Sequence, residues 1–130
     1  MPGFPLAAAV LYAKDISKVG DFYAKVACLQ VTHEEQDHVV LESGAFQLVV
    51  VAVPPELGAT IHVTKPPHRR ESTAIKLVFP VDSLRAARHA AQSHGGQLNS
   101  PGREWLFQGS RVCDGHDPEG NVVQFRERAL

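Results

Sequence analysis

The stretch from residue 76 to residue 98 reads KLVFPVDSLRAARHAAQSHGGQL and holds a strand, a helix and the start of a second strand. Its first part belongs to the apolar run TAIKLVFPV, which predicts a strand over 73–81. Ser83 is a typical N-cap for the helix LRAARHAAQSH, and Gly95-Gly96 ends that helix. The chain then turns into extended runs: QLNSP, REWLFQG, SRVCDGH and NVVQFRER. This half of the sequence therefore predicts a βαβββ unit.

The N-terminal half has the same order. The apolar run LAAAVLYA, residues 6–13, predicts a short strand, and Asp15 and Ser17 precede a helix in which apolar residues fall at helical spacing. Three strand-like runs follow, LQVTHEE, HVVLES and AFQLVVVAV, separated by turns at 34–37 and 43–44. A shift of 68 residues lays Ala8 on Lys76 and Ile16 on Leu84. The sequence thus contains two copies of one βαβββ pattern.

Four prolines mark the connection between the two copies, residues 54–71, where TIHVT is a possible short strand. We expect a single α+β domain over 1–130, with one module at 1–53 and the other at 72–130. Each module gives a curved sheet too small to bury its concave face alone, so pairing of the modules is expected to form a curved mixed sheet around a cleft.

Composition excludes several classes of function. Thirteen Lys and Arg balance fourteen Asp and Glu, which argues against a nucleic-acid partner. The short cluster His68-Arg69-Arg70 is interpreted as a solvated loop face. No run is long enough to cross a membrane, and no basic segment precedes the first apolar run, so a soluble cytoplasmic protein is expected. Cys28 and Cys113 form no CxxC pair and are expected to be buried structural thiols.

The chain resembles the vicinal oxygen chelate superfamily, which includes glyoxalase I, extradiol dioxygenases and bleomycin-resistance proteins. Three stretches carry the resemblance: VLYAKDISKVGDFYAKVACLQV, the stretch 76–98 quoted above, and HDPEGNVVQF near the C-terminus. The resemblance implies the glyoxalase/bleomycin resistance fold, a small-molecule ligand and a homodimer. In metal-dependent members, His and Glu from the first and last strand of each unit hold a divalent ion.

This chain departs from that ligand set. The positions fall on Ala8, Lys76, Gln124 and one residue within 47–49, where the register is uncertain and none is His, Asp or Glu. An ammonium repels a cation and a carboxamide binds one weakly. We therefore expect no metal and no other cofactor.

Five residues are candidate ligand contacts. Lys76 stands in an apolar strand and, if it points inward, needs an anion, which is either a ligand or a protein carboxylate, with Glu104 as the expected partner. The alternative is an outward side chain whose apolar stem carries the ammonium group to water. Gln124 can orient a ligand or make a cross-strand hydrogen bond. Trp105 can form a stacking wall, although core packing is the favoured interpretation. Arg126 and Arg111 can complete an anion site or lie at the surface. The predicted ligand-binding set is Lys76, Gln124, Glu104, Trp105 and Arg126.

The stretch DGHDPEGNVVQF crowds acids beside a histidine, as a metal site would. Residues 117–121, DPEGN, nevertheless have the composition of a turn, in which the acids serve backbone geometry. His116 is expected to be a partly exposed neighbour of this turn.

Two classes of function are favoured over a third, a protein-interaction or regulatory role, for which no exposed motif speaks. The favoured hypothesis is a metal-free binding protein, of the resistance or sequestration kind, for a small neutral or anionic ligand. The alternative is a glyoxalase-like lyase or isomerase, or a dioxygenase, that uses acid-base residues such as Lys76, Glu104 or a histidine, or a metal site that is not inherited.

Overall fold

The computed structural model describes residues 6–128. The expectation that no basic segment precedes the first apolar run rests partly on residues 1–5, outside this range. The N-terminal module contains β1 (Ala7–Ala13), α1 (Ile16–Val26), β2 (Gln30–Glu34), β3 (His38–Glu42) and β4 (Phe46–Ala52). The C-terminal module contains β5 (Leu77–Pro80), α3 (Leu84–Ser93), β6 (Gln97–Leu98), a 3-10 turn at Pro101–Arg103, β7 (Trp105–Phe107), β8 (Ser110–His116) and β9 (Val122–Arg128). Among these described residues, no helix is both long and apolar enough to span a membrane.

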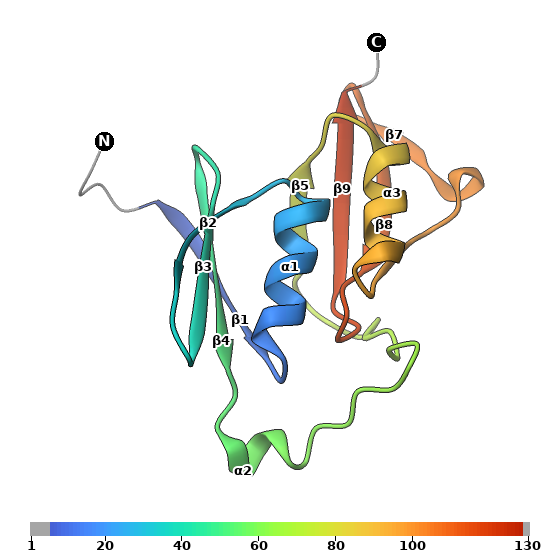
Figure 1. The fold of residues 1–130 in the computed structure, drawn as a ribbon. Helices are drawn as coiled ribbons and strands as arrows, with labels where there is room; N and C mark the ends of the chain where they lie inside the picture. Colours follow the sequence, from blue (N-terminus) through green and yellow to red (C-terminus); the bar gives the residue numbers. More distant parts are fainter. Residues whose placement is uncertain (1–5, 129–130) are drawn as a thin grey trace.

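The two modules share one topology, as the internal repeat predicts. The N-terminal sheet has the order β1-β4-β3-β2, and the C-terminal sheet has the order β5-β9-β8-β6, with β7 also paired to β8. In each module the first strand runs parallel to the last, and the remaining pairs are antiparallel. Figure 1 shows the N-terminal sheet on the left and the C-terminal sheet on the right. The predicted pair of βαβββ modules is therefore confirmed.

Both helices begin where the sequence predicts. Asp15 caps α1 by accepting the N–H of Lys18, and Ser83 caps α3 by accepting the N–H of Ala86. Glu127 of β9 also accepts the N–H of Leu84, at 2.7 Å, which ties the start of α3 to its own sheet. Such caps satisfy backbone donors that have no partner inside the helix.

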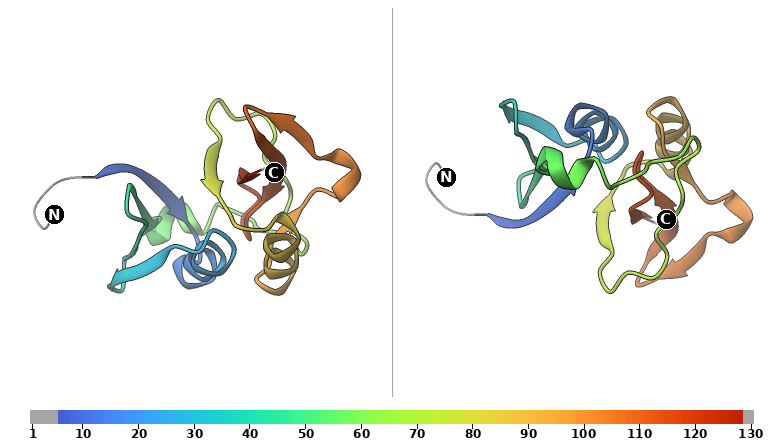
Figure 2. Two further views of the ribbon diagram at one scale, coloured as in Figure 1. Left: turned by 90° about the horizontal axis from the view of Figure 1, so that it is seen from above. Right: turned by 90° about the horizontal axis from the view of Figure 1, so that it is seen from below.

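One apolar core joins the modules. α1 and α3 pack against each other, and Figure 2 shows them side by side, seen from above and from below. Phe79 of β5 contacts two rings of the N-terminal module, with centroids 5.7 Å from Tyr23 and 5.9 Å from Phe46. A side chain at Gly96 would place its Cβ 2.4 Å from the Phe22 ring, so only glycine fits after α3.

The connection differs from expectation. It holds a short helix, α2 (Pro55–Gly58), and no strand forms at 60–64, where TIHVT was a possible one. It then crosses below both modules in Figure 1 and reaches β5, which begins only at Leu77. Lys76 therefore lies just before this strand rather than inside it. Arg69 also departs from the predicted solvated loop face, since its side chain is only 23% exposed.

Candidate functional site

The strands of each sheet bury one face and leave the other outside the shared core. In the C-terminal sheet, Phe79, Val123 and Phe125 point into the core, so the alternate residues point outward. We call this surface the C-terminal outer face. Its members come from four neighbouring strands: Val78 and Pro80, Gln124 and Arg126, Val112 and Asp114, and Trp105 and Phe107.

A chain of polar contacts runs across this face. Lys76 Nζ donates to Asp114 Oδ2 at 2.8 Å, and Gln124 Nε2 donates to Asp114 Oδ1 at 3.1 Å. Arg126 Nε in turn donates to Gln124 Oε1 at 2.9 Å. The contacts fix the orientation of the Gln124 amide, which is 8% exposed. Lys76, Gln124 and Arg126, three of the predicted site residues, are thus brought together.

Asp114 corrects the expected partner of Lys76. The sequence favoured Glu104 for this ion pair, and that prediction is wrong. Asp114 lies directly opposite Gln124 in the β8–β9 hairpin, so it is on the same face as the ammonium group. The sequence placed Asp114 in the extended run SRVCDGH, and only the hairpin register shows that it faces Gln124.

Glu104 has a different environment. Its carboxylate pairs with Arg88 of α3 and lies 3.8 Å from Arg111 Nη1, on the helix side of the sheet. Arg111 is therefore committed to a protein carboxylate and does not complete an anion site on the outer face. The two pairs connect the segment that precedes β7 to α3 and β8.

Aromatic side chains form one wall of the C-terminal outer face. Trp105 is 41% exposed and Phe107 is 45% exposed, so Trp105 is not the core residue that the sequence favoured. The guanidinium carbon of Arg126 lies 5.1 Å from the centre of the Phe107 ring, within the range of a cation–π contact. Val112 is fully buried on the outer face of the sheet, outside the core that the two modules share.

A cavity of about 860 Å³ opens on this face. The residues around it are Val78, Pro80, Val81, Arg126, Arg128, Asp82, Ser110 and Cys28. Two guanidinium groups face one carboxylate, so the cavity is electropositive. Cys28, expected to be buried, is exposed here, whereas Cys113 is buried as predicted and its burial raises the pKa of its thiol.

The N-terminal sheet has an equivalent surface, which we call the N-terminal outer face. Val10 is 57% exposed and Tyr12 is 64% exposed, and their strand neighbours Val40, Val49 and Val51 are partly exposed. Glu42 lies on the same face and accepts a hydrogen bond from Gln47 at 2.7 Å. Within residues 6–128 the two outer faces belong to separate sheets. The two modules of one chain therefore do not join into the single curved sheet around a cleft that was expected from their pairing.

Strand register identifies the uncertain ligand position. Ala9 and Leu77 are equivalent by the 68-residue shift, and they pair with Leu48 and Val123. The next residues on those last strands, Val49 and Gln124, are therefore equivalent. The positions that hold the metal ligands in metal-dependent members are therefore occupied by Ala8, Val49, Lys76 and Gln124 in this chain. Two apolar side chains, an ammonium group and a carboxamide do not form a site for a divalent ion. No group of three His, Cys, Asp or Glu side chains with metal-binding geometry occurs in the part of the chain that the structure describes.

The turn at 117–121 links the modules. Asp117 is fully buried and accepts hydrogen bonds from the Tyr23 hydroxyl, from two backbone N–H groups of its own turn and from the Asn121 amide. Glu119 accepts the backbone N–H groups of Lys14, at 2.9 Å, and of Asp15, at 2.8 Å. The turn geometry was predicted from composition, but its contacts with the N-terminal module were not. His116, expected to be partly exposed, is buried at 7% exposure.

Comparisons with known proteins agree with this architecture. Residues 8–125 match the family model described as a glyoxalase-like domain. A comparison with curated protein sequences finds no match.

Solved structures with the same fold include proteins of different descriptions. A bleomycin resistance determinant encoded on the transposon Tn5 is 15% identical with a TM-score of 0.60, over 98% of this chain and all of that one. An antibiotic binding protein from Streptomyces sp. CB03234 is 20% identical with a TM-score of 0.61, over 99% of each chain. A glyoxalase/bleomycin resistance protein/dioxygenase family enzyme from Burkholderia phytofirmans PsJN is 18% identical with a TM-score of 0.67, over 94% of this chain and 97% of that one. Taken with the family match across nearly its whole length, the chain belongs to the glyoxalase-like domain family.

Proposed function

We propose that this protein is a cytoplasmic, metal-free binding protein that sequesters a small neutral or anionic molecule on its C-terminal outer face. The observation that carries the proposal is the chain of contacts from Lys76 through Asp114 and Gln124 to Arg126, set beside exposed aromatic rings. Binding sites for small molecules combine an apolar wall with a few oriented polar groups. This face has both components.

The charges on the face favour an anion over a cation. Asp114 is already engaged by Lys76 and Gln124. Arg126 and Arg128 have no carboxylate partner among the described residues, and both line the cavity of about 860 Å³. A guanidinium group can bind a carboxylate or phosphate through two parallel hydrogen bonds.

We assign the predicted site residues different roles in this proposal. Lys76 and Arg126 supply charge, Gln124 supplies oriented amide groups, and Trp105 supplies a stacking surface. Glu104 acts indirectly, because its pairs with Arg88 and Arg111 hold the segment that leads into Trp105.

We further propose that a homodimer closes the cleft, with the N-terminal outer face of one copy over the C-terminal outer face of the other. Exposed Val10 and Tyr12 would gain apolar burial in this arrangement. Glu42 on one face complements Arg126 and Arg128 on the other in charge. Two proteins of the same fold, a bleomycin resistance determinant and an antibiotic binding protein, have roles of this kind. Their sequence identities to this chain are low and support only the shared fold.

The test is a ligand titration followed by fluorescence. Trp105 is the only tryptophan of the chain, so its emission reports directly on the proposed face. A panel of small carboxylates, phosphates and neutral aromatic compounds is titrated into the wild-type protein and into Lys76→Met and Lys25→Met. Lys25 is an exposed lysine of α1, outside both outer faces, and serves as the matched control.

The expected result is saturable quenching by at least one anionic compound, with affinity reduced about tenfold in Lys76→Met and unchanged in Lys25→Met. Thermal unfolding checks that the variants fold. If binding is equal in wild type and Lys76→Met across the whole panel, Lys76 is not the anchor, and the proposal fails in that form.

A further inference from the structure

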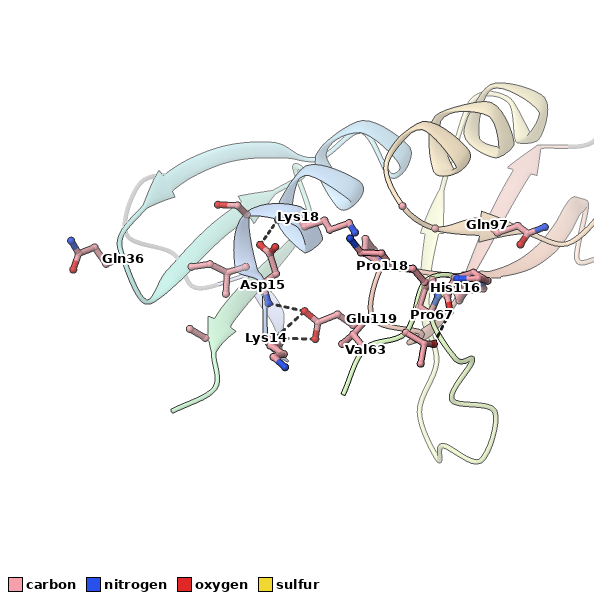
Figure 3. A pocket seen from close by; sticks show the side chains of 18 residues that line it. Lys14, Asp15, Lys18, Gln36, Val63, Pro67, Gln97, His116, Pro118 and Glu119 are labelled. Carbon is pink, nitrogen blue, oxygen red and sulfur yellow. Dashed lines mark hydrogen bonds between the residues drawn. The ribbon is translucent and has the colours of Figure 1, made fainter. Parts of the chain in front are cut away.

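A second cavity lies at the junction of the modules, on different elements from the proposed ligand face. This junction cavity has a volume of about 850 Å³, within the range of sites that enclose small organic molecules. It is bounded by the start of α1, by residues 63–67 of the connection, by residues 95–97, and by His116, Pro118 and Glu119 at the end of β8 and in the turn (Figure 3). It shares no lining residue with the cavity on the C-terminal outer face.

The carboxylates of the junction cavity are already satisfied by backbone groups. Glu119 accepts the N–H groups of Lys14 and Asp15, and Asp15 accepts the N–H of Lys18, as the dashed lines in Figure 3 mark. The ammonium group of Lys14 donates a hydrogen bond to the Ile61 carbonyl. Lys18 and Lys65 have no carboxylate partner for their ammonium groups in the described chain. The lining therefore carries three ammonium groups, of Lys14, Lys18 and Lys65, against the two carboxylates of Asp15 and Glu119.

A smaller cavity adjoins it and is more strongly basic. This annex has a volume of about 420 Å³ and is lined by Arg69, Arg103, His116, Gln97, Leu98, Asn99 and Ser100, with no carboxylate among them. His116 and Gln97 line both cavities and so form their common wall. The two cavities therefore adjoin at His116 and Gln97.

Arg69 is held in place with unused hydrogen-bonding capacity. Its Nη1 donates to the Asn99 side-chain oxygen at 2.7 Å. Its Nε is enclosed without a hydrogen-bond partner and lies 3.5 Å from the Glu71 carboxylate. The Glu71 carboxylate offsets part of the Arg69 charge, and the guanidinium N–H groups that are not bonded to Asn99 remain as donors for an oxyanion in the annex.

His116 adds a directional requirement. Its Nδ1 lies 3.0 Å from the Asp117 carbonyl, which assigns the hydrogen to Nδ1 in the neutral ring and leaves Nε2 as an acceptor. A phosphate monoester carries negative charge for the guanidinium groups and, as the monoanion, an O–H for Nε2. A carboxylate offers charge but no such hydrogen.

We propose that the annex and the junction cavity together form a second binding site, for a phosphate monoester of a small organic molecule. The phosphate lies between Arg69 and Arg103 and beside His116, and the organic group extends into the junction cavity, where Val63, Pro66 and Pro67 supply apolar contacts. This inference does not depend on the function proposed for the outer face.

Isothermal titration calorimetry with phenyl phosphate at low ionic strength tests the proposal. The wild-type protein is compared with Arg69→Gln and with Arg103→Gln. Among the described residues, the Arg103 side chain has no hydrogen-bond or ion-pair partner, so its replacement should not impair folding. Arg85→Gln, an exposed arginine of α3 that lines neither cavity, is the matched control. Inorganic phosphate and benzoate serve as probes of the phosphate alone and of a carboxylate with a similar ring.

We expect phenyl phosphate to bind more tightly than either comparison probe. Arg69→Gln and Arg103→Gln should each reduce its affinity about tenfold, and Arg85→Gln should leave it unchanged. Absence of saturable binding to the wild type, or an equal loss in Arg85→Gln, overturns the proposal. If Arg126→Gln abolishes binding while Arg103→Gln does not, the phosphate occupies the outer face instead, which overturns this inference and leaves the proposed function standing.

Discussion

The hydroxyl of Tyr23 donates a hydrogen bond of 2.9 Å to the carboxylate of Asp117, and both side chains are buried. The tyrosine belongs to α1 and the aspartate to the turn between β8 and β9, so this contact joins the two modules across 94 residues of sequence. The same carboxylate receives two backbone N–H groups of its turn. One group therefore stabilises both the turn and the module interface.

Loss of the Tyr23 hydroxyl should destabilise the protein. In Tyr23→Phe the ring and its edge contact with Phe22 remain, but Asp117 loses one donor in a buried site. We expect the free energy of unfolding, measured in urea, to fall by about 1.5–3 kcal/mol, the range for a hydrogen bond to a charged group. Tyr12→Phe removes an exposed hydroxyl and should change stability little. An equal effect of both substitutions would contradict the role assigned to the Tyr23–Asp117 bond.

The same bond predicts an alkaline dependence of stability. Burial raises the pKa of Tyr23 well above its ordinary value, and the nearby Asp117 carboxylate raises it further. A tyrosine in the unfolded chain ionises near pH 10. Above that pH the unfolded state loses a proton that the folded state retains, so the stability contributed by Tyr23 is present below about pH 10 and is lost as the pH rises further.

Urea unfolding at a series of pH values from 8 to about 11 measures this effect. The wild-type protein and Tyr12→Phe should both lose stability above about pH 10, and Tyr23→Phe should lose less, because its slope lacks one ionising group. Subtraction of the Tyr23→Phe curve from the wild-type curve removes the contributions of other groups that ionise at alkaline pH, such as Cys113. Parallel curves for wild type and Tyr23→Phe would show that Tyr23 does not carry the dependence.

Glu119 predicts a local effect at the entrance of α1. In Glu119→Gln, the amide oxygen can take the place of Oε2 and still accept from Lys14 and Asp15, but the buried N–H₂ group at the place of Oε1 then faces the N–H of Lys14, which is also a donor. Because a buried donor left unpaired costs about 1–3 kcal/mol, we expect lower stability. Amide hydrogen exchange should accelerate first at residues 14 and 15. Glu56→Gln, in exposed α2, is the control and should change neither quantity.

The sequence predicted the elements of the fold better than the contacts between them. Apolar runs, the caps Asp15 and Ser83, and the internal repeat gave both modules, because these signals depend on neighbouring residues. Lys76, Gln124 and Arg126 lie near one another, as the repeat and the alternation along β9 predicted, whereas Trp105, for which core packing was favoured, is exposed. The predicted ion pair of Lys76 failed because it depends on the register of β8, which the local sequence does not encode. Glu119 and Asp117 were interpreted only as turn residues for a similar reason: their partners lie about 100 residues away.

Metal analysis distinguishes the binding role from the enzymatic alternative. Ala8, Val49, Lys76 and Gln124 occupy the positions where metal-dependent relatives hold His and Glu, so we expect no stoichiometric divalent metal in the purified protein. We also expect no turnover of the hemithioacetal of methylglyoxal and glutathione when Ni²⁺, Zn²⁺, Mn²⁺ or Fe²⁺ is added. One tightly bound ion per chain, or turnover that depends on the added ion, would favour a glyoxalase-like enzyme with a site of different composition.

The proposed dimer makes a prediction that depends on one strand of the N-terminal sheet. If the N-terminal outer face covers the C-terminal outer face of a second copy, a charge at its centre is buried without a partner, which is strongly unfavourable. Val49→Lys places an ammonium there, between Val10 and Val40 on the neighbouring strands. We expect sedimentation velocity to show a dimer for the wild type and a folded monomer for Val49→Lys. Leu57→Lys adds the same charge on α2, where the side chain is 57% exposed and outside both faces, and it should remain dimeric.

Because the dimer closes the ligand cleft, Val49→Lys should also bind the anionic ligand more weakly, although it leaves Lys76, Gln124 and Arg126 unchanged. A dimer that survives this substitution, or a wild-type protein that is monomeric with full ligand affinity, would mean that the C-terminal outer face binds its ligand without a second copy.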